Sequence, residues 1–318
     1  MKAPSPLPSA MAAGLDRVLR RSPLQAVFQA RGGGRRLAVL AYHAVEDEEM
    51  FSRHLDYLAA RYHPVSLDAV LAALARKAEL PRRAVLITFD DADRTVLDRA
   101  LPLLRARGLP AVAFVVTGQL DGNEPFWWTE VEHLVRAGGR ARAFEGAGPI
   151  DIVRGLKQVP EQDRRAAIAE LRASAPVSAP GHSQLRSADL RLLMEAGVSI
   201  GNHTETHPCL PRCSEEEMRR EVLAAHQAIA TATGAAPVAF AYPNGDWDPR
   251  AERALEGLGY RAAFLFDHAL THADGHPFRL SRVRTGSTVS LQRFALIVSG
   301  LHPALHRLRS RATRRTHR

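Results

Sequence analysis

Short apolar runs that alternate with longer helix-like segments are the feature of this 318-residue sequence that most restricts its fold. Most of these runs are apolar at nearly every position, which is typical of strands covered on both faces in a parallel sheet. The pattern therefore predicts an α/β fold of successive β/α units, and a single barrel of such units fits this length. The predicted strands occupy residues 37–42, 84–89, 111–116, 198–202, 238–242, 262–266 and 279–284.

Residue types that begin and end helices mark several of the segments between these strands. Ser66 is predicted to cap one helix, and Gly108 is predicted to end the next one. Ser214 and Glu217 have the spacing of a capping box, in which each side chain accepts a backbone N–H of the other residue. Helices are therefore expected to begin just after Ser66 and just after Ser214.

Residues 118–185 form the longest segment between two predicted strands. They contain three consecutive aromatic residues, Phe126, Trp127 and Trp128, followed by a glycine-rich stretch and a helix predicted over 161–173. Connections within compact α/β folds are usually short. A segment of this length therefore predicts an inserted subdomain or lid.

The formal net charge of +9 is unevenly distributed along the chain. Residues 1–36 hold seven basic side chains and one acidic one, and residues 301–318 hold six arginines and no acid. The part between them is slightly acidic, so we expect no nucleic-acid-binding face on it. We predict a basic N-terminal arm (1–36), a β/α barrel with its insertion (37–300) and a basic C-terminal tail (301–318).

Several features of the sequence indicate where in the cell the protein is located. It contains no run of 18 apolar residues, so no membrane-spanning helix is predicted. Prolines and charges interrupt the apolar stretch near the N-terminus, which argues against a signal peptide. Two cysteines, Cys209 and Cys213, are too few for a disulfide framework. We expect a cytoplasmic protein whose basic ends make weak, salt-sensitive contact with the inner face of a membrane.

Polar residues directly follow four of the predicted strands. In parallel β/α folds the carboxyl ends of the strands meet at one edge, where ligands bind and catalysis occurs. We therefore expect these four groups to converge on one site. They are Tyr42-His43, Asp90-Asp91, His203-Thr204-Glu205-Thr206-His207 and Pro243-Asn244-Gly245-Asp246.

His203 and His207 have a spacing that allows two imidazoles to bind one divalent ion, although other histidine pairs in the chain share it. Only this pair follows a predicted buried strand, and Asp90 and Asp91 end a second such strand. An Asp-His-His set leaves metal positions open for water and substrate, as hydrolysis requires. The other aspartate is then available as a general base.

Two alternatives involve no catalysis. The paired aspartates also suit a solvated turn or the N-cap of the following helix. The two histidines together with Cys209 and Cys213 would also suit a closed structural zinc site, although these cysteines lack the paired spacing of zinc fingers.

The two strongest motifs together resemble one known family. Thr88-Phe89-Asp90-Asp91, followed by His203-Thr204-x-x-His207, is similar to the signature of the polysaccharide deacetylases, the NodB-homology or carbohydrate esterase 4 family. The resemblance spans residues 37–290 and implies an α/β fold of the distorted (β/α)7 barrel type. It implies that Asp90 is the catalytic base and that Asp91, His203 and His207 bind the metal.

A third motif also resembles the family, whereas three positions differ from the family pattern. Phe240-Ala241-Tyr242-Pro243-Asn244-Gly245 resembles a family motif in which a backbone N–H, here that of Asn244, stabilises the oxyanion. The family often has glycine at the position of Ala92 and an arginine that orients the base at the position of Ala241. Leu280-Ser281-Arg282 stands where the family has a histidine general acid. We expect Arg282 to replace the missing arginine, and His43 to act as the acid or to shape the pocket.

The resemblance implies a metal-dependent hydrolase, with Zn²⁺ as the expected cation, that removes an N-acetyl group from an N-acetylated sugar or polysaccharide. A lipid-linked sugar is one candidate substrate. A deacylase acting on a non-glycan C–N bond and a non-catalytic glycan-binding protein are alternatives, because a fold does not determine its function. The residues expected to contact the substrate are Tyr42, Tyr242, Pro243, Trp127 and Trp128.

Overall fold

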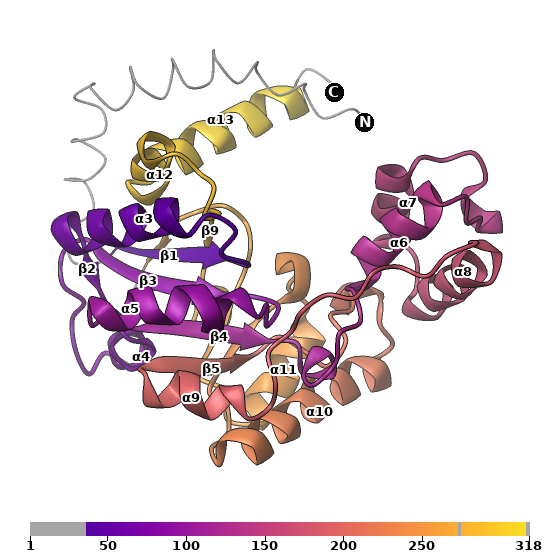
Figure 1. Ribbon diagram of the computed structural model, residues 1–318. Helices are drawn as coiled ribbons and strands as arrows, with labels where there is room; N and C mark the ends of the chain where they lie inside the picture. Colours follow the sequence, from indigo (N-terminus) through magenta and orange to yellow (C-terminus); the bar gives the residue numbers. More distant parts are fainter. Residues whose placement is uncertain (1–35, 273–274, 316–318) are drawn as a thin grey trace.

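The structure, a computed structural model, describes residues 36–272 and 275–315 (Figure 1). Apart from Arg36, the predicted basic arm lies outside the described residues. A curved, mostly parallel sheet is surrounded by helices, and three further helices project to one side (Figure 1). No helix in the described ranges is long and apolar enough to span a membrane.

Six strands of the described chain form the main sheet in the spatial order β7, β6, β5, β4, β3, β1. Each strand is parallel to its neighbours in this order. Every one of them overlaps a predicted strand, so the predicted α/β fold is confirmed. Their bounds are β1 (Arg36–Tyr42), β3 (Ala84–Phe89), β4 (Ala111–Val115), β5 (Val198–Asn202), β6 (Ala239–Ala241) and β7 (Ala262–Phe264).

One short segment joins the two edges of this sheet. Leu280 pairs with β7, where its N–H donates to Ala263 O over 2.9 Å. Three residues later β9 (Val283–Arg284) pairs in parallel with β1. The seventh predicted strand, 279–284, is therefore a crossing segment that pairs with β7 at one end and with β1 at the other. We call residues 280–284 the closing segment.

Two further strands are very short. The first, β2 (His63–Pro64), pairs in parallel with β3. The second, β8 (Thr271–His272), lies antiparallel to β1. The sequence pattern did not predict either of them, because two residues are too few to produce a periodic signal.

Helices cover the outer face of the sheet (Figure 1). Ser66 caps its helix as predicted, since its side chain accepts the N–H of Ala69. Ser214 and Glu217 form the predicted capping box. The covering helices are α3 (Glu48–Arg61), α5 (Leu101–Ala106), α9 (Asp189–Glu195), α10 (Glu215–Thr233), α11 (Pro249–Gly257) and α12 (Leu291–Val298). Helix α4 (Leu67–Leu74) instead packs its buried residues against the opposite face of the strands.

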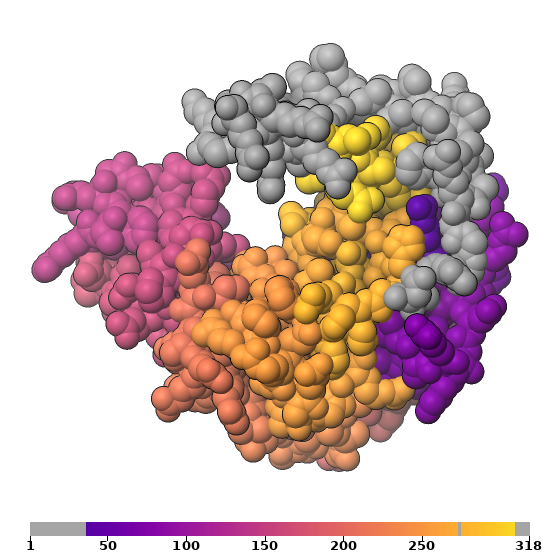
Figure 2. All heavy atoms as spheres, turned by 180° about the vertical axis from the view of Figure 1, so that it is seen from behind, coloured from indigo at the N-terminus to yellow at the C-terminus, as the bar shows by residue number. Residues whose placement is uncertain are grey.

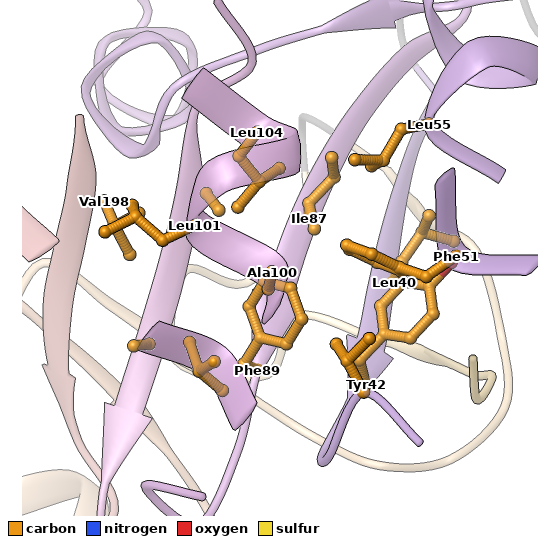
Figure 3. Packing of buried hydrophobic residues seen from close by; sticks show 14 of the residues in the cluster. Leu40, Tyr42, Phe51, Leu55, Ile87, Phe89, Ala100, Leu101, Leu104 and Val198 are labelled. Carbon is orange, nitrogen blue, oxygen red and sulfur yellow. The ribbon is translucent and has the colours of Figure 1, made fainter. Parts of the chain in front are cut away.

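The alternation of side chains along each strand separates two hydrophobic cores. Leu40 of β1 and Ile87 of β3 point outward and pack against Phe51 and Leu55 of α3 (Figure 3). Residues on the opposite face of the same strands, among them Val39 and Leu86, belong to the core inside the barrel. Because both faces of each strand are buried, both sets of positions must be apolar. This explains why the strands are continuous apolar runs in the sequence.

The predicted insertion contains three helices with a hydrophobic core of their own. They are α6 (Trp127–Arg136), α7 (Pro149–Leu156) and α8 (Glu161–Ser174), and their shared core includes Leu134 and Leu171. Figure 2 shows this group, in magenta, projecting from one side of the barrel. Its position beside the carboxyl ends of the strands allows it to form part of a site there.

Residues predicted as a basic C-terminal tail are helical as far as Arg315. Helix α13 (Leu301–Arg315) follows α12 directly, and Leu301 is buried at its start. The prediction considered only the arginine content of this segment. It did not take into account that arginine and leucine are good helix formers.

Candidate active site and metal centre

A cleft of about 530 Å³ lies at the carboxyl ends of the strands. The barrel contributes the residues that follow β1, β3, β5, β6 and β7, together with Arg282 and Arg284 of the closing segment. The insertion contributes one wall through Trp128, Val153 and Lys157. The four groups of polar residues that follow strands in the sequence are thus represented in a single cleft.

Asp91, His203 and His207 form a compact group of buried ligand atoms, all within 4.8 Å of one another. Asp91 Oδ1 is 3.5 Å from His203 Nε2 and 3.7 Å from His207 Nε2. These distances are too long for good hydrogen bonds, and the buried Asp91 Oδ1 has no hydrogen-bond partner. Two imidazoles and one carboxylate match the ligands that Zn²⁺ prefers, so these residues fit a divalent metal site.

A backbone carbonyl orients the first of these histidines. His203 Nδ1 lies 2.7 Å from Ala241 O, which is a hydrogen bond if Nδ1 carries the proton. That tautomer leaves the lone pair of Nε2 facing Asp91, as a metal ligand requires. Ala241 thus acts through its backbone at the position where the family often has an arginine.

A second group of contacts holds the loop between the two histidines. The buried side chain of Glu221, from α10, accepts the backbone N–H of Thr206 over 2.8 Å and its hydroxyl over 2.7 Å. Thr204 accepts the His207 N–H over 3.0 Å. The sequence analysis missed Glu221. A carboxylate on the same helix face as Met218 and Val222 was a signal that could have identified it.

Asp90 lies in the same cleft as the metal group and forms a bidentate ion pair. Arg282 donates to its two carboxylate oxygens over 2.6 and 2.7 Å. Arg282 is itself fully buried, and a further nitrogen donates to Leu265 O over 2.8 Å. Burial alone would raise the pKa of Asp90, but the Arg282 guanidinium and the neighbouring His203 outweigh it, so this pKa lies below its usual range. Asp90 is therefore ionised at neutral pH.

The metal-site residues are in a different electrostatic state. Burial raises the pKa of Asp91 and lowers the pKa of His207 well below its usual value. A bound divalent cation favours an ionised carboxylate and a neutral imidazole, so it would offset the cost of burying Asp91.

Backbone strain is concentrated around the cleft. Asp91, Thr204, His207 and Asn244 have φ values of 78°, 70°, 56° and 58°, in the left-handed region that non-glycine residues seldom adopt. Ala92, at the position where the family often has glycine, has a φ of 72°. Strained positions of this kind cluster at functional sites, where the surrounding structure enforces them.

The structure places His43 and Asn244 in the same cleft. His43 Nε2 is 3.9 Å from Asp91 Oδ2, and its partly exposed ring packs edge-on against Phe266. The side chain of Asn244 accepts a hydrogen bond of 2.6 Å from Lys157 Nζ. The sequence analysis missed Lys157. It is one of only three lysines in a chain rich in arginine, and this was a weak signal for it.

The predicted substrate-contacting aromatic residues differ in position. Trp128 lines the cleft, with its ring centroid 4.6 Å from that of His207. Trp127 instead packs within the insertion, beneath the Arg164 guanidinium, and donates from Nε1 to His207 O. Its main contacts are therefore structural.

Tyr42 does not reach the cleft. As the last residue of β1 it lies among the outward-pointing residues beside Phe51 (Figure 3). Its buried hydroxyl contacts His54 Nδ1 over 3.1 Å. The Tyr242 side chain is also fully buried and packs beside Phe240 in the core beneath α10 and α11, and Pro243 is buried next to it. The expectation that Tyr42 stacks against a sugar is corrected, because its ring points into a core. Tyr242 borders the cleft although its ring is buried, so its contact with a substrate stays a prediction.

The closed structural zinc site is not formed. Among the described residues, the group able to hold a metal contains Asp91 and the two histidines but no cysteine. Cys213 Sγ is 3.7 Å from the carbonyl oxygen of Cys209, and burial raises the pKa of Cys213 to about 12. Both cysteines are therefore buried thiols of the protein interior.

Comparison with known proteins identifies the family. The sequence model described as polysaccharide deacetylase matches residues 77–143 and 168–263, just over half of the chain. The chain belongs to the polysaccharide deacetylase family. The unmatched residues between these two ranges include α7, so this part of the insertion, which carries Lys157, lies outside the family pattern.

Curated relatives match shorter parts of the chain. The poly-beta-1,6-N-acetyl-D-glucosamine N-deacetylase of Staphylococcus epidermidis is 29% identical over 115 residues, which cover 36% of this chain and 38% of that protein. The protein of the same name from Staphylococcus aureus is 41% identical over 51 residues, 16% of this chain and 17% of its own length. The chain thus matches well under half the length of these relatives.

Solved structures of deacetylases have the same fold. The deacetylase PplD of Streptococcus pyogenes, solved in complex with acetate, has a TM-score of 0.59 at 17% identity, over 83% of this chain and 98% of that chain. IcaB from Ammonifex degensii has a TM-score of 0.58 at 19% identity, over 84% of this chain and 97% of that chain. At such low identities the likeness establishes the fold alone.

Proposed function

We propose that this protein is a metal-dependent hydrolase that removes the N-acetyl group from an N-acetylated sugar or polysaccharide. The observation that carries the proposal is the presence, in one cleft, of the Asp91-His203-His207 group beside an ionised carboxylate, Asp90. Hydrolysis of an acetamide requires groups that bind a cation and a base that accepts a proton from water. The relatives named as N-acetyl-D-glucosamine N-deacetylases support a sugar carrying an acetamido group as the substrate.

Asp90 would accept the proton of the attacking water. Arg282 keeps this carboxylate ionised and holds both of its oxygens, so the base is charged and oriented before substrate binds. Arg282 cannot itself supply a proton, because a guanidinium remains protonated in proteins. Its proposed role is therefore to position Asp90.

The backbone N–H of Asn244 is our candidate donor to the acetamide oxygen, where negative charge develops during the reaction. His43 is our candidate for the group that gives a proton to the departing sugar amine. It is partly exposed at the cleft and lies beside the second oxygen of Asp91. A histidine is suited to this step because its ring nitrogens can both accept and donate a proton.

Asp91, His203 and His207 would hold the divalent cation, and we propose Zn²⁺ from the ligand types. When bound, this cation polarises the acetamide carbonyl and lowers the pKa of water. The side chains that orient the ligands, Glu221 above all, would keep the site assembled in the absence of substrate.

The direct test is acetate release by the purified protein from a panel of N-acetylated monosaccharides, oligosaccharides and lipid-linked sugars. Metal content is measured on the same preparation. We expect acetate release that stops when a chelator removes the metal and returns when Zn²⁺ is restored. A metal-loaded protein that releases no acetate from any member of the panel would contradict the proposal.

A matched pair of variants tests the metal site. The double variant His203→Ala plus His207→Ala should lose the metal, whereas Cys209→Ser plus Cys213→Ser should retain it. Loss of the metal in the cysteine variant and its retention in the histidine variant would instead support a structural zinc site that includes the cysteines.

A further inference from the structure

Two cations in the catalytic cleft have no part in the proposed chemistry. Lys157 follows the last residue of α7, and Arg284 ends β9. Neither has a carboxylate oxygen within 4.0 Å among the described residues. Arg282, the third cation of the cleft, is by contrast neutralised by Asp90.

Both cations are anchored to one continuous wall of the cleft, made of Asn244, Gly245 and Phe266. We call these three residues the 244–266 ridge. Lys157 Nζ donates to Asn244 Oδ1 over 2.6 Å, and Arg284 donates from Nε and Nη2 to Phe266 O over 2.9 and 2.6 Å. Gly245 packs so closely on Phe266 that a Cβ there would lie 2.4 Å from the Phe266 nitrogen.

These anchors fix the two cations but use only some of their donors. A lysine ammonium has three N–H donors and a guanidinium has five. Lys157 retains two N–H groups, and Arg284 retains its Nη1, beyond the contacts that the described residues provide. Each side chain is therefore held in place on the ridge with donors left for a ligand.

The three acids that line the cleft are engaged elsewhere, whereas Asp246 and Asp267 lie near Lys157 and Arg284, respectively, without forming an ion pair with them. Asp90 is paired with Arg282, Asp91 belongs to the metal group, and Glu132 is paired with Arg136 at 3.0 Å. The ridge thus presents two separate cations beside the position where an acetamide would react. An anionic group on the substrate would find complementary charge there.

We propose that Lys157 and Arg284 bind a phosphate group attached to the N-acetylated sugar or to its neighbour. The inference rests on the proposed function and deepens it, since it makes the preferred substrate a phosphorylated sugar. Two cations match the charge of a phosphate monoester, which is between −1.5 and −2 at neutral pH, and a guanidinium binds phosphate oxygens well. Poly-N-acetylglucosamine, named for the relatives, has no such charge.

The test compares kcat/KM of the holoenzyme for N-acetylglucosamine 1-phosphate and for the uncharged methyl glycoside of N-acetylglucosamine. We expect the wild-type protein to prefer the phosphate, and this preference to fall about tenfold in Arg284→Gln and in Lys157→Gln, the scale of one lost charge-assisted hydrogen bond. Arg279→Gln is the matched control. Arg279 is paired with Glu252 outside the cleft, so this variant should keep the wild-type preference.

Equal kcat/KM for the two sugars in the wild type, or a preference unchanged in both variants, would overturn the inference. A third arm presents the same sugar linked through phosphate to a prenyl chain in detergent micelles. A preference shared by the soluble and prenylated compounds assigns recognition to the phosphate, whereas a preference confined to the prenylated one assigns it to the lipid and rejects our inference.

Binding is measured separately so that the two proposals can fail independently. Calorimetry on the metal-loaded Asp90→Asn protein compares the two sugars without turnover. Discrimination in binding without any acetate release from the wild type would reject the proposed function and retain the ridge as a phosphate site. Acetate release by the wild type, together with equal binding of the two sugars, would support the proposed function and reject the ridge as a phosphate site.

Discussion

Two adjacent aspartates have opposite electrostatic environments. The carboxylate of Asp90 is held by Arg282, and its pKa is lowered. The carboxyl of Asp91 has an unpartnered oxygen, and its pKa is raised by burial. Neighbouring residues at a strand end point in different directions, which would let Asp91 bind a metal while Asp90 accepts a proton, as we propose.

Exchange of one aspartate at a time should separate these two roles. We expect Asp90→Asn to retain its metal and to lose about 100-fold or more in kcat, the scale of losing a general base. Asp91→Asn, one residue away, should lose metal affinity. Metal content and steady-state rates check both variants. Near wild-type turnover by Asp90→Asn would remove Asp90 from the role of base.

The bidentate pair gives a prediction for Arg282. Lysine offers a point charge that cannot reproduce two parallel hydrogen bonds, so Arg282→Lys should fold and lose much of kcat. Arg282→Met leaves a buried carboxylate unpaired and should lower the free energy of unfolding by roughly 3–5 kcal/mol. Denaturant unfolding and kcat are the measurements. Unchanged kcat in Arg282→Lys would show that Asp90 needs no fixed orientation.

Ala92 occupies a left-handed backbone position, where a side chain costs roughly 1 kcal/mol relative to glycine. Relief of this strain should offset the loss of the buried methyl group, so Ala92→Gly should change the free energy of unfolding by less than about 1 kcal/mol. The control is Ala225→Gly at a buried position inside α10, which should be clearly destabilising. Equal losses in the two variants would mean that Ala92 carries no strain.

At the scale of elements, the metal site depends on contacts between β5, α10 and the loop that joins them. The buried carboxylate of Glu221 accepts hydrogen bonds from the backbone N–H and the hydroxyl of Thr206, one residue before the proposed metal ligand His207. Burial raises the pKa of Glu221, and the Thr206 hydrogen bonds oppose this change. The helix thus orients a ligand that it does not itself contain.

Replacement of Glu221 should therefore weaken the metal site without unfolding the barrel. We expect Glu221→Gln to raise the dissociation constant of the metal by about 10-fold or more, the usual effect of losing a group that supports a ligand. Glu216→Gln, in the first turn of the same helix, is the control and should leave metal affinity unchanged. Competition with a chromogenic chelator measures both, and equal affinities would limit Glu221 to a structural role.

Continuous apolar runs were sufficient to predict six strands, and the polar residues after them to predict an Asp-His-His set. The choice of Asp91 over Asp90 for this set came from the family resemblance. Periodicity could not predict the orientation of Tyr42, because in a strand buried on both faces every position is apolar. Lys157 and Glu221 were missed because their partners, Asn244 and Thr206, lie 87 and 15 residues away along the chain. Such contacts arise from tertiary packing, which no local pattern encodes.

At the scale of the whole molecule, basic residues are concentrated at the two ends of the chain, and most of those at the C-terminal end lie in α13. We propose weak contact with the inner face of an anionic membrane, since each basic residue near such a surface contributes at most about 1 kcal/mol. Deletion of residues 309–318 spares buried Leu301 and should reduce sedimentation with anionic vesicles at low salt.

The same truncated protein should turn over a soluble substrate at the wild-type rate, because the residues that line the cleft in the described part of the chain range from His43 to Arg284. Vesicles of zwitterionic lipid are the control and should bind neither protein. Full binding by the truncated protein would exclude the C-terminal charge as the cause.

The closing segment both pairs with the two edges of the sheet and carries Arg282, the partner of Asp90. Arg282 lies 192 residues after Asp90, so the proposed base is synthesised long before the group that keeps it ionised. Until the closing segment joins β7 to β1, Asp90 lacks the guanidinium that lowers its pKa, and burial would favour its neutral, non-basic form. A chain in which this segment is not yet in place therefore lacks the charged and oriented carboxylate that the proposed reaction needs. Closure of the sheet edges and completion of the proposed base thus depend on the same five residues, 280–284.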